Sequence, residues 1–365
     1  MSGADLNLAS DERAQMDAAA APVASAPPPQ RLDTTYRPKH PFDFWTVLGT
    51  LRMGRNDPAH LHDGRVFWRV SRTPEGVATL ALGPRADGSV NGSAWGAGAR
   101  WAIEQLPTLL GALDDATPFE AHHHPLIAEV HRRNPGLRLA RTDLVFDALV
   151  ASIIEQKVTG MQAYSAWRSL LTTHGERAPG PTPRPMFAPP SVAQWQRMPS
   201  WELHRAGLEP PQARTIVECA RRGERLVVAA VAAGTAVADV TAGTADTAGT
   251  AAQTAAEAGA RAAATSRARE RVLMGMRGVG VWTAAETRIR AFGDPDAVSF
   301  GDYHLSHGVG FALTGTRVDD DGMRELLEPW SAQGQRQRVI RLIGLSGMQE
   351  PRRGPRLHPE DHRER

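Results

Sequence analysis

The sequence predicts an α+β protein in which a mixed N-terminal domain is followed by a mainly helical domain. Val66, Trp68 and Val70 alternate with other residues as in a half-buried strand. Residues 77–82 form a second candidate strand. After the turn-forming sequence at 134–136, apolar residues recur every three or four positions, which is typical of helices. With 365 residues, the chain has room for two domains of about 100–200 residues each.

Composition divides the chain further. Residues 1–37 are rich in Ala, Pro and Ser and predict a disordered tail. The N-terminal α+β domain is expected at 38–135 and the helical domain at 136–347, followed by a C-terminal tail at 348–365. Within the helical domain, residues 229–264 are mostly Ala, Thr and Gly, which favours a flexible low-complexity insertion. A helix over part of this insertion is the alternative, because Ala is the best helix former.

The helical domain opens with a helix that Asp143 is expected to cap, because Asp accepts hydrogen bonds from the free N–H groups at a helix start. Gly160 separates this helix from a second one. The prolines between 179 and 190 recur too often for a helix or a ladder and predict a loop. Further helices are expected at 101–113, 191–206, 211–229, 267–276, 281–292, 303–313, 322–328 and 335–346.

Arginine carries almost all of the positive charge, because Lys39 and Lys157 are the only lysines. High-GC coding would produce this bias without functional meaning, whereas a functional cause would be bidentate recognition of phosphate. The formal net charge of +2 does not exclude DNA binding, since a local stripe of arginine is sufficient for phosphate contacts.

Cys219 is the only cysteine, which excludes an intramolecular disulfide and a four-cysteine metal cluster. The N-terminus has acidic residues and no continuous apolar core, so a secretory signal is not expected. The longest apolar run, residues 226–233, is too short to cross a bilayer. These observations predict a cytoplasmic protein that does not associate with membranes.

The most informative segment lies within residues 273–302. A helix is expected to end near Met276. A tight turn with Gly278 and Gly280 then leads into a new helix at about Val281. The free N–H groups at that helix start favour an anion, and a DNA phosphate is a suitable one. A purely structural hairpin between two helices would need glycine as well.

Two segments carry a resemblance to a known family: Gly-Val-Gly-Val-Trp-Thr-Ala at 278–284 and Asp-Ala-Val-Ser-Phe-Gly-Asp-Tyr at 296–303. They resemble the hairpin and catalytic-aspartate signature of the helix-hairpin-helix/Gly-Pro-Asp DNA glycosylase superfamily. Within it, the chain is most similar to the DNA-3-methyladenine glycosylase II branch, which acts in alkylation repair. Residues 41–51 resemble the opening of that branch's TATA-binding-protein-like N-terminal domain. Residues 134–139 with 146–158 resemble the first helix of its catalytic domain.

The resemblance implies a base-excision-repair glycosylase that hydrolyses the N-glycosidic bond of a flipped-out damaged base in double-stranded DNA. The implied base is alkylated and 3-methyladenine-like, and the enzyme would act as a monomer, associated with the nucleoid when bound to DNA. Asp302 matches the catalytic carboxylate, which would stabilise positive charge on the sugar. A helix cap is the alternative role for Asp302. Bifunctional relatives carry a lysine at the position of Trp282, so a monofunctional enzyme without lyase activity is expected.

The resemblance implies four residues in the substrate pocket: Trp282, Tyr303, Glu286 and Thr50. Core packing is the alternative for the two aromatic side chains. Thr50, Glu286 and Gly344 stand where this branch has aromatic residues, so the pocket is expected to be less aromatic. We hypothesise that Glu286 compensates by attracting a cationic base through its charge.

The resemblance also implies a set of DNA-binding residues, which are Gly278, Val279, Gly280, Thr283, Gln156, Lys157 and Val158. Lys157 is a departure, since this loop should carry a bulky apolar wedge that fills the gap left by the flipped nucleotide. Either Lys157 binds phosphate while Val158 or Met161 supplies the wedge, or Lys157 is an ordinary solvated lysine. A Lys157 that reached the sugar would add lyase chemistry.

No transition metal or organic cofactor is implied. The hairpin carbonyls of Met276 and Val279 are candidates for a monovalent cation by resemblance. The adjacent histidines at 122–124 are expected to point in different directions and to lie in a solvated loop. Two other functions stay open, namely a glycosylase for a deaminated or mismatched base and a paralogue that binds damaged DNA without catalysis.

Overall fold

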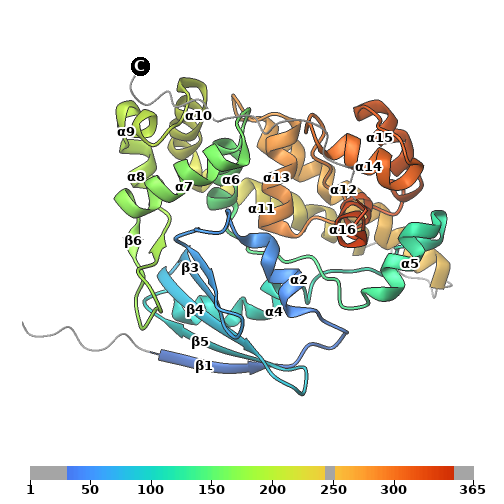
Figure 1. Cartoon of the computed structure of the whole chain (residues 1–365), viewed down its shortest axis with the longest axis horizontal. Helices are drawn as coiled ribbons and strands as arrows, with labels where there is room; N and C mark the ends of the chain where they lie inside the picture. The colour runs from blue at the N-terminus through green and yellow to red at the C-terminus, as the bar shows by residue number, and fades with distance from the viewer. Residues whose placement is uncertain (1–30, 243–250, 349–365) are drawn as a thin grey trace, which may run out of the picture.

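The computed structural model describes residues 31–242 and 251–348, and the predicted α+β class is confirmed. Five antiparallel strands form one sheet in the order β1-β5-β4-β3-β2 (Figure 1). These strands are β1 (Arg31–Tyr36), β2 (His60–His62), β3 (Phe67–Thr73), β4 (Gly76–Pro84) and β5 (Val90–Trp95). The two strands predicted from alternation correspond to β3 and β4, which pair with Phe67 opposite Leu82.

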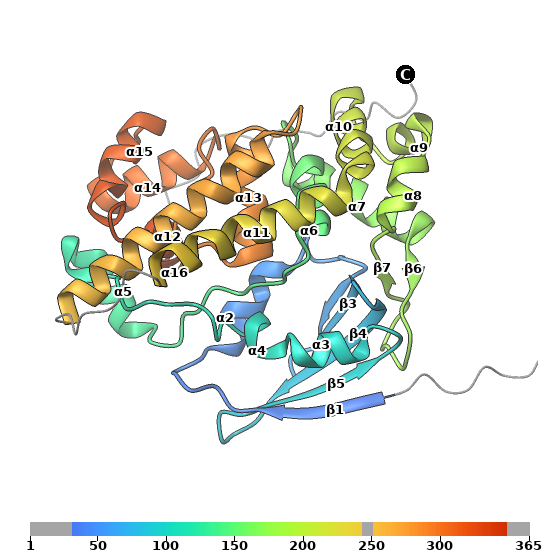
Figure 2. The same ribbon diagram turned by 180° about the vertical axis from the view of Figure 1, so that it is seen from behind.

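Helices cover one face of the sheet. Helix α3 (Ala99–Glu104) and helix α4 (Leu106–Leu109) lie across it in Figure 2, and α2 (Phe44–Leu48) packs into the same apolar core. Leu82 and Leu106 are fully buried within that core. Apolar side chains alternate along β4 and β5, so one face of the sheet can be buried in this way. Whether this domain matches the TATA-binding-protein-like type stays a prediction.

The predicted disordered tail at 1–37 contains strand β1, so that prediction is wrong for its last residues. Leu32 lies opposite Ala94 and Tyr36 opposite Val90, in antiparallel register with β5. Strand β1 is an edge strand whose alternate residues are exposed, and only the intervening ones are half-buried. Such a strand needs few apolar residues, which explains why composition alone indicated a tail. Residues 1–30, and 349–365 of the predicted C-terminal tail, lie outside the described residues.

The rest of the described chain is mainly helical. Its α-helices are α5 (Pro125–Arg133), α6 (Val145–Ile154), α7 (Gly160–His174), α8 (Val192–Arg197), α9 (Ser200–Arg205), α10 (Pro210–Arg221), α11 (Gly223–Ala242), α12 (Ala251–Met274), α13 (Val281–Phe292), α14 (Leu305–Thr314), α15 (Asp320–Leu327) and α16 (Arg336–Ser346). The short elements are the 3-10 helices η2 (Gly49–Leu51), η3 (Ala121–His123) and η4 (Glu328–Trp330), and the two-stranded β6 (Glu176–Arg177) and β7 (Phe187–Ala188). The predicted helix at 191–206 is divided into α8 and α9 at Pro199, which cannot donate a helical hydrogen bond.

Helix α6 lies at the centre of the helical part, with almost every side chain buried. It packs along α13, and a helix that is apolar all round is expected in such a core position. The predicted cap at Asp143 is wrong, because Leu144 occupies the N-cap position. Asp143 has a positive φ of 55° and instead accepts a hydrogen bond from Nε of Arg141 at 2.6 Å.

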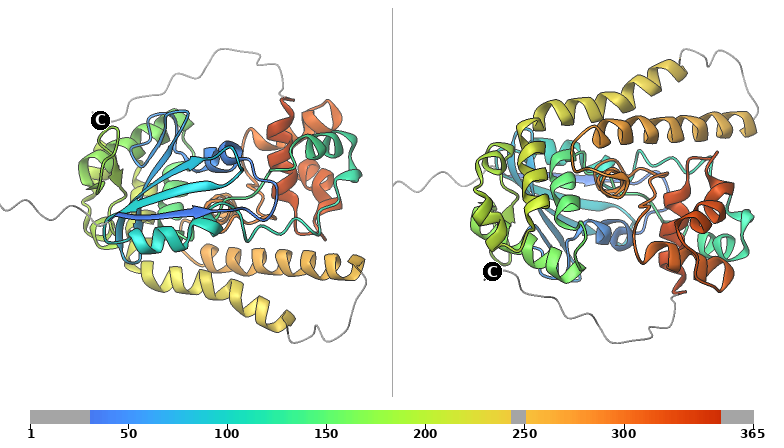
Figure 3. Two further views of the ribbon diagram at one scale, coloured as in Figure 1. Left: turned by 90° about the horizontal axis from the view of Figure 1, so that it is seen from below. Right: turned by 90° about the horizontal axis from the view of Figure 1, so that it is seen from above.

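Two long helices replace the flexible insertion predicted at 229–264. The described parts of that segment belong to α11 and α12, which pack side by side along one edge of the molecule (Figure 3). Ala230 and Ala263 are buried in this region, although neither is large enough to mark an apolar face in the sequence. The Ala-rich helix, which was the alternative, is therefore the structure found for the described residues.

The boundary between the two parts falls earlier than the predicted residue 135. Helix α5 packs against α16, and Ile127 and Val130 share an apolar core with Trp330 and Leu342. Helix α5 thus belongs to the helical part. In the described ranges, no helix has both the length and the apolar character needed to span a membrane.

Candidate active site

The predicted glycine turn connects α12 to α13. Gly278 has a φ of +87°, and a Cβ added there would collide with the side chain of Thr215, so only glycine fits without rearrangement. Gly280 differs, because its φ of −94° is ordinary and open space lies around the position of a Cβ. As the N-cap residue of α13, Gly280 leaves the first N–H groups of this helix open to an approaching group. The amide of Val279 donates to the carbonyl of Met276 at 3.1 Å, and the cation role of these two carbonyls stays a prediction.

The loop after α6 is held against this hairpin by Gln156. Its Nε2 donates to the carbonyl of Gly278 at 3.0 Å and to Oγ1 of Thr283 at 2.8 Å. Gln212, from α10, donates to the carbonyls of Ile154 and Gln156, both at 3.0 Å. These hydrogen bonds hold the two predicted DNA-binding segments together, although Val279 and Thr283 are themselves buried.

The structure of the same loop distinguishes the two candidates for the wedge, Val158 and Met161, and shows the position of Lys157. Val158 is half-buried and packs against the main apolar core. Lys157 is exposed and has a φ of +55°, in the left-handed region that a non-glycine residue rarely adopts. Met161 leaves 63% of its surface exposed. The side chains that project from this loop are therefore Lys157 and Met161.

Asp302 is held by three hydrogen bonds where the chain enters α14. Its Oδ1 accepts from the amides of His304 at 2.8 Å and Leu305 at 2.9 Å. Its Oδ2 accepts from Nε1 of Trp282 at 3.2 Å, and Trp282 lies in the first turn of the hairpin helix α13. The carboxylate is half-buried, so it has a fixed position and still reaches solvent. Asp302 thus accepts from two amides at the entry to α14, whose N-cap residue is His304, and contacts the first turn of the hairpin helix at the same time.

The other predicted pocket residues lie at different depths. Glu286 is one turn after Trp282 on α13; its Oε1 accepts from the hydroxyl of Ser299 at 2.5 Å. Tyr303 is 75% exposed, and its ring contacts the rings of two neighbouring histidines at the surface. Thr50 is exposed, and its hydroxyl donates to the carbonyl of Val47 at 2.9 Å. Only Trp282 and Glu286 are thus placed with Asp302 on the hairpin side.

Sequence reasoning missed three residues in the surroundings of Glu286, namely Glu155, Arg290 and Tyr164. Nη2 of Arg290 lies 2.6 Å from Oε2 of Glu155, and its Nη1 lies 3.1 Å from Oε2 of Glu286. Burial raises the pKa of Glu155, and the negative charges of Glu286 and Asp302 act in the same direction, against the Arg290 guanidinium. Burial, followed by the charge of Glu155, also raises the pKa of Tyr164. The spacing of residues 282, 286 and 290 on one helix face was the signal available in the sequence.

Arg290 also borders a cavity between the sheet and α6. This cavity measures about 60 Å³, enough for a few water molecules, and its polar lining includes His60, Arg69 and Asp147. Burial raises the pKa of Asp147 to about 7, although Arg69 and Arg72 lower it. Burial also lowers the pKa of Arg69 to about 10. Charged groups therefore meet where the two parts of the molecule are in contact.

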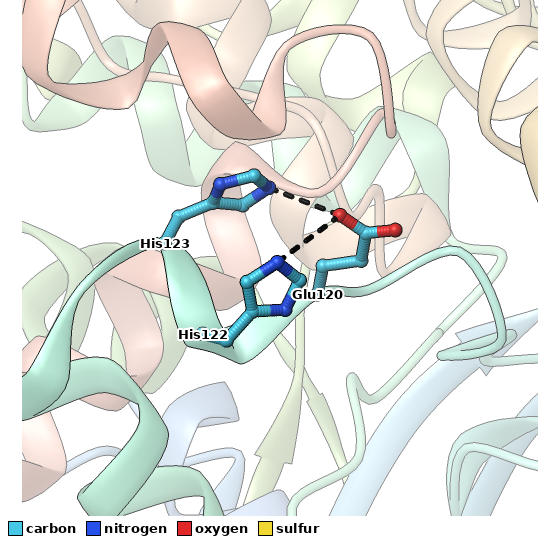
Figure 4. Close-up of side chains that lie close together, drawn as sticks. All are labelled: Glu120, His122 and His123. Carbon is cyan, nitrogen blue, oxygen red and sulfur yellow. Dashed lines mark ion pairs between the residues drawn. The ribbon is translucent and has the colours of Figure 1, made fainter.

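The histidine cluster differs from its predicted arrangement. His122 and His123 do not point apart, because both direct Nε2 toward Oε2 of Glu120, at 3.8 and 3.1 Å (Figure 4). The 3-10 turn η3 makes this convergence possible, and His124 turns away to accept a hydrogen bond from the amide of Leu126. Glu120, His122 and His123 are all exposed, as expected for a solvated loop. Gln333 also donates to His123 at 3.0 Å.

Comparison with solved structures shows that this fold is shared with DNA glycosylases. The chain is similar to the 3-methyladenine DNA-glycosylase from Archaeoglobus fulgidus, with 15% identity and a TM-score of 0.60, over 86% of this chain and 98% of that one. It is also similar to the 8-oxoguanine glycosylase/lyase from Clostridium acetobutylicum, with 11% identity and a TM-score of 0.58, over 88% and 99% of the two chains. That enzyme in complex with double-stranded DNA containing cytosine opposite 8-oxoguanine gives 13% identity and a TM-score of 0.55, over 86% and 96% of the two chains.

No model of a protein family and no curated protein matches the sequence. At such low identity, the likeness establishes the fold alone.

Proposed function

We propose that this chain is a base-excision-repair DNA glycosylase that hydrolyses the N-glycosidic bond of a flipped-out damaged base. The observation that carries the proposal is the position of Asp302. The amides of His304 and Leu305 and the indole of Trp282 fix its carboxylate beside the start of the hairpin helix. An immobile carboxylate that remains accessible to solvent is what the reaction requires.

Cleavage of the bond between C1′ and the base nitrogen leaves the electron pair on the base and builds positive charge on the sugar. Asp302 stabilises this charge and orients the water that attacks C1′. The water loses a proton, and the products are a free base and an abasic site. The base must first leave the stack, since its glycosidic bond is inaccessible inside a duplex.

The DNA-binding surface combines the hairpin with the loop after α6. The open N–H groups at the start of α13 favour a phosphate, and Gly280 leaves room for the backbone to approach. Lys157 and Met161 project from the adjoining loop, one suited to a phosphate and the other to the gap in the duplex. The partner is double-stranded DNA, bound by a monomer in the cytoplasm and associated with the nucleoid.

The enzyme is monofunctional, because Trp282 stands where a Schiff-base lysine would be needed on α13. Its lesion is an alkylated base, the class implied by the resemblance to the DNA-3-methyladenine glycosylase II branch. Contacts of Glu286 change one part of the earlier hypothesis. Its charge is shared with Arg290, so Glu286 alone is a weak attractor for a cationic base.

The test is base release from duplexes that carry 3-methyladenine or another alkylated base, compared with deaminated and mismatched bases. We expect release of the free base and an abasic site that stays unbroken until alkali is added. Asp302→Asn should lose release and keep DNA binding, because Asn also caps helices well and preserves the start of α14. Undiminished release by Asp302→Asn would refute the catalytic role, and strand cleavage without alkali would refute the absence of lyase activity. Binding without release by the native protein would favour a non-catalytic paralogue.

A further inference from the structure

Beyond Trp282, the partner of Asp302, the hairpin helix leads into a cluster of three charged residues, Glu155, Arg290 and Glu286. Trp282, Glu286 and Arg290 follow at four-residue intervals, so they occupy one face of α13. Glu155 comes from the C-terminal end of α6, which packs along α13. The cluster thus extends from the hairpin helix to the loop that carries Gln156.

The two carboxylates of the cluster are not equally engaged. Glu286 uses both of its oxygens, one for the Ser299 hydroxyl at 2.5 Å and one for Arg290 at 3.1 Å. Glu155 pairs with Arg290 through Oε2 alone, and Arg290 is its one side-chain hydrogen-bond partner in the described parts of the chain. Because a carboxylate has about four lone-pair positions, Glu155 retains most of its accepting capacity.

Glu155 and Asp302 share one environment. Asp302 accepts from Nε1 of Trp282 at 3.2 Å and Glu155 pairs with Arg290 at 2.6 Å, and both of these partners lie on one face of α13. The charge of Asp302 contributes to the raised pKa of Glu155, and the charge of Glu155 to the raised pKa of Tyr164. The Tyr164 ring lies against Gly54 of the N-terminal part, where a Cβ would collide with it. An incompletely paired carboxylate therefore adjoins the helix face whose Trp282 donates to the proposed catalytic group.

We infer that the Glu155 carboxylate reads the Watson–Crick edge of the flipped base and selects a base with two adjacent N–H donors, as on a guanine-type edge. This inference rests on the proposed function. The N1–H and the 2-amino group of a guanine derivative point side by side and match the two oxygens of a carboxylate. An adenine-type edge places an acceptor next to its amino group, and a hypoxanthine-type edge lacks the second donor. The inferred base is therefore a methylated guanine and not the 3-methyladenine-like base that the resemblance implies. Arg290 is a positioning residue, because it holds Glu155 and does not need to touch the base.

The test uses two duplexes that differ by one amino group, with 7-methylguanine or 7-methylhypoxanthine opposite cytosine. Loss of one hydrogen bond to a buried charge predicts that the native protein releases 7-methylguanine about 10- to 100-fold faster in single turnovers. Glu155→Gln should abolish this preference, because Gln offers one acceptor and one donor. Glu286→Gln is the matched control, a carboxamide on the other side of the same guanidinium, and should keep the preference.

Equal rates for the two bases with the native protein, or a preference that survives in Glu155→Gln, would overturn the inference. Binding separates this result from failure of the proposed function. Asp302→Asn should bind the 7-methylguanine duplex about 10-fold or more tightly than its partner duplex, measured as the ratio of the two Kd values. Equal Kd values would also overturn the inference. Selective binding together with no release of either base by the native protein would overturn the proposed function only.

Discussion

Asp147, at the contact between the sheet and α6, should make the stability of this protein fall as the pH rises through the neutral range. Burial raises its pKa from 3.8 to about 7. The folded protein therefore keeps a proton that the unfolded chain releases at lower pH. For a raised carboxyl pKa, the free energy of unfolding decreases from pH 3.8 upward and levels off above pH 7.

The perturbation is Asp147→Asn, which fixes the neutral form. Each pKa unit corresponds to about 1.4 kcal/mol, so the two units between pH 5 and pH 7 amount to about 3 kcal/mol. This value is an upper bound, because Asp147 is half-buried and borders the cavity. The stability of the variant relative to the native protein should therefore increase by up to about 3 kcal/mol from pH 5 to pH 8.

The assay is urea unfolding at pH 5, 6, 7 and 8, followed by the fluorescence of the nine tryptophans. Subtracting the free energy of unfolding of the native protein from that of the variant at each pH cancels the titration of the other groups. Asp321→Asn controls for the loss of one negative charge, because Asp321 is 89% exposed and pairs only at the surface with Arg324. A difference between Asp147→Asn and native protein that is constant with pH, or that shrinks as the pH rises, would refute the reasoning.

Three further substitutions test the hairpin and the site. Gly278→Ala should lower the free energy of unfolding by about 2 kcal/mol or more, because residue 278 has a positive φ and a Cβ there collides with Thr215. Gly280→Ala should lower it by less than about 1 kcal/mol. Equal losses in thermal or urea unfolding would contradict this. Gln156→Ala removes two hydrogen bonds to the hairpin and should weaken DNA binding about 10-fold in fluorescence anisotropy, and unchanged affinity would show that the loop position does not matter. Trp282→Phe keeps a ring and loses the hydrogen bond to Asp302, so kcat/KM for base release should fall about 10-fold with little change in melting temperature; an unaltered kcat/KM would argue against this contact.

The sequence predicted the elements whose apolar residues are large and periodic. Strands β3 and β4 and helices α6 and α13 are of this kind. Strand β1 was missed because an edge strand with one half-buried face needs few apolar residues. For the segment of α11 and α12, a helix was only the alternative to a flexible insertion, because Ala and Gly are too small to show an apolar helix face in the sequence. These small residues nevertheless pack closely, as at Gly234, which approaches the side chain of Arg269.

In the candidate site, the local motif was visible and the long-range contacts were not. Gly278, Trp282 and Asp302 could be selected because they lie within 25 residues of one another in a recognisable order. Glu155 and Arg290 are 135 residues apart, and nothing local indicates that an acidic residue at a helix end will meet that arginine. Spacing along α13 could have placed Arg290 near Glu286, but the partner on α6 required the packed structure.

Arg290 connects two regions, since it lines the cavity between β3 and α6 and also forms an ion pair with Glu155. If Glu155 reads the base as inferred, substitutions at Arg69 or Asp147, which line the same cavity as Arg290, should alter discrimination between lesions. In a laboratory selection for a new substrate, adaptive changes should arise on the sheet as well as around the base. Residues 69, 147 and 155 would then show epistasis, with the effect of one change depending on the others.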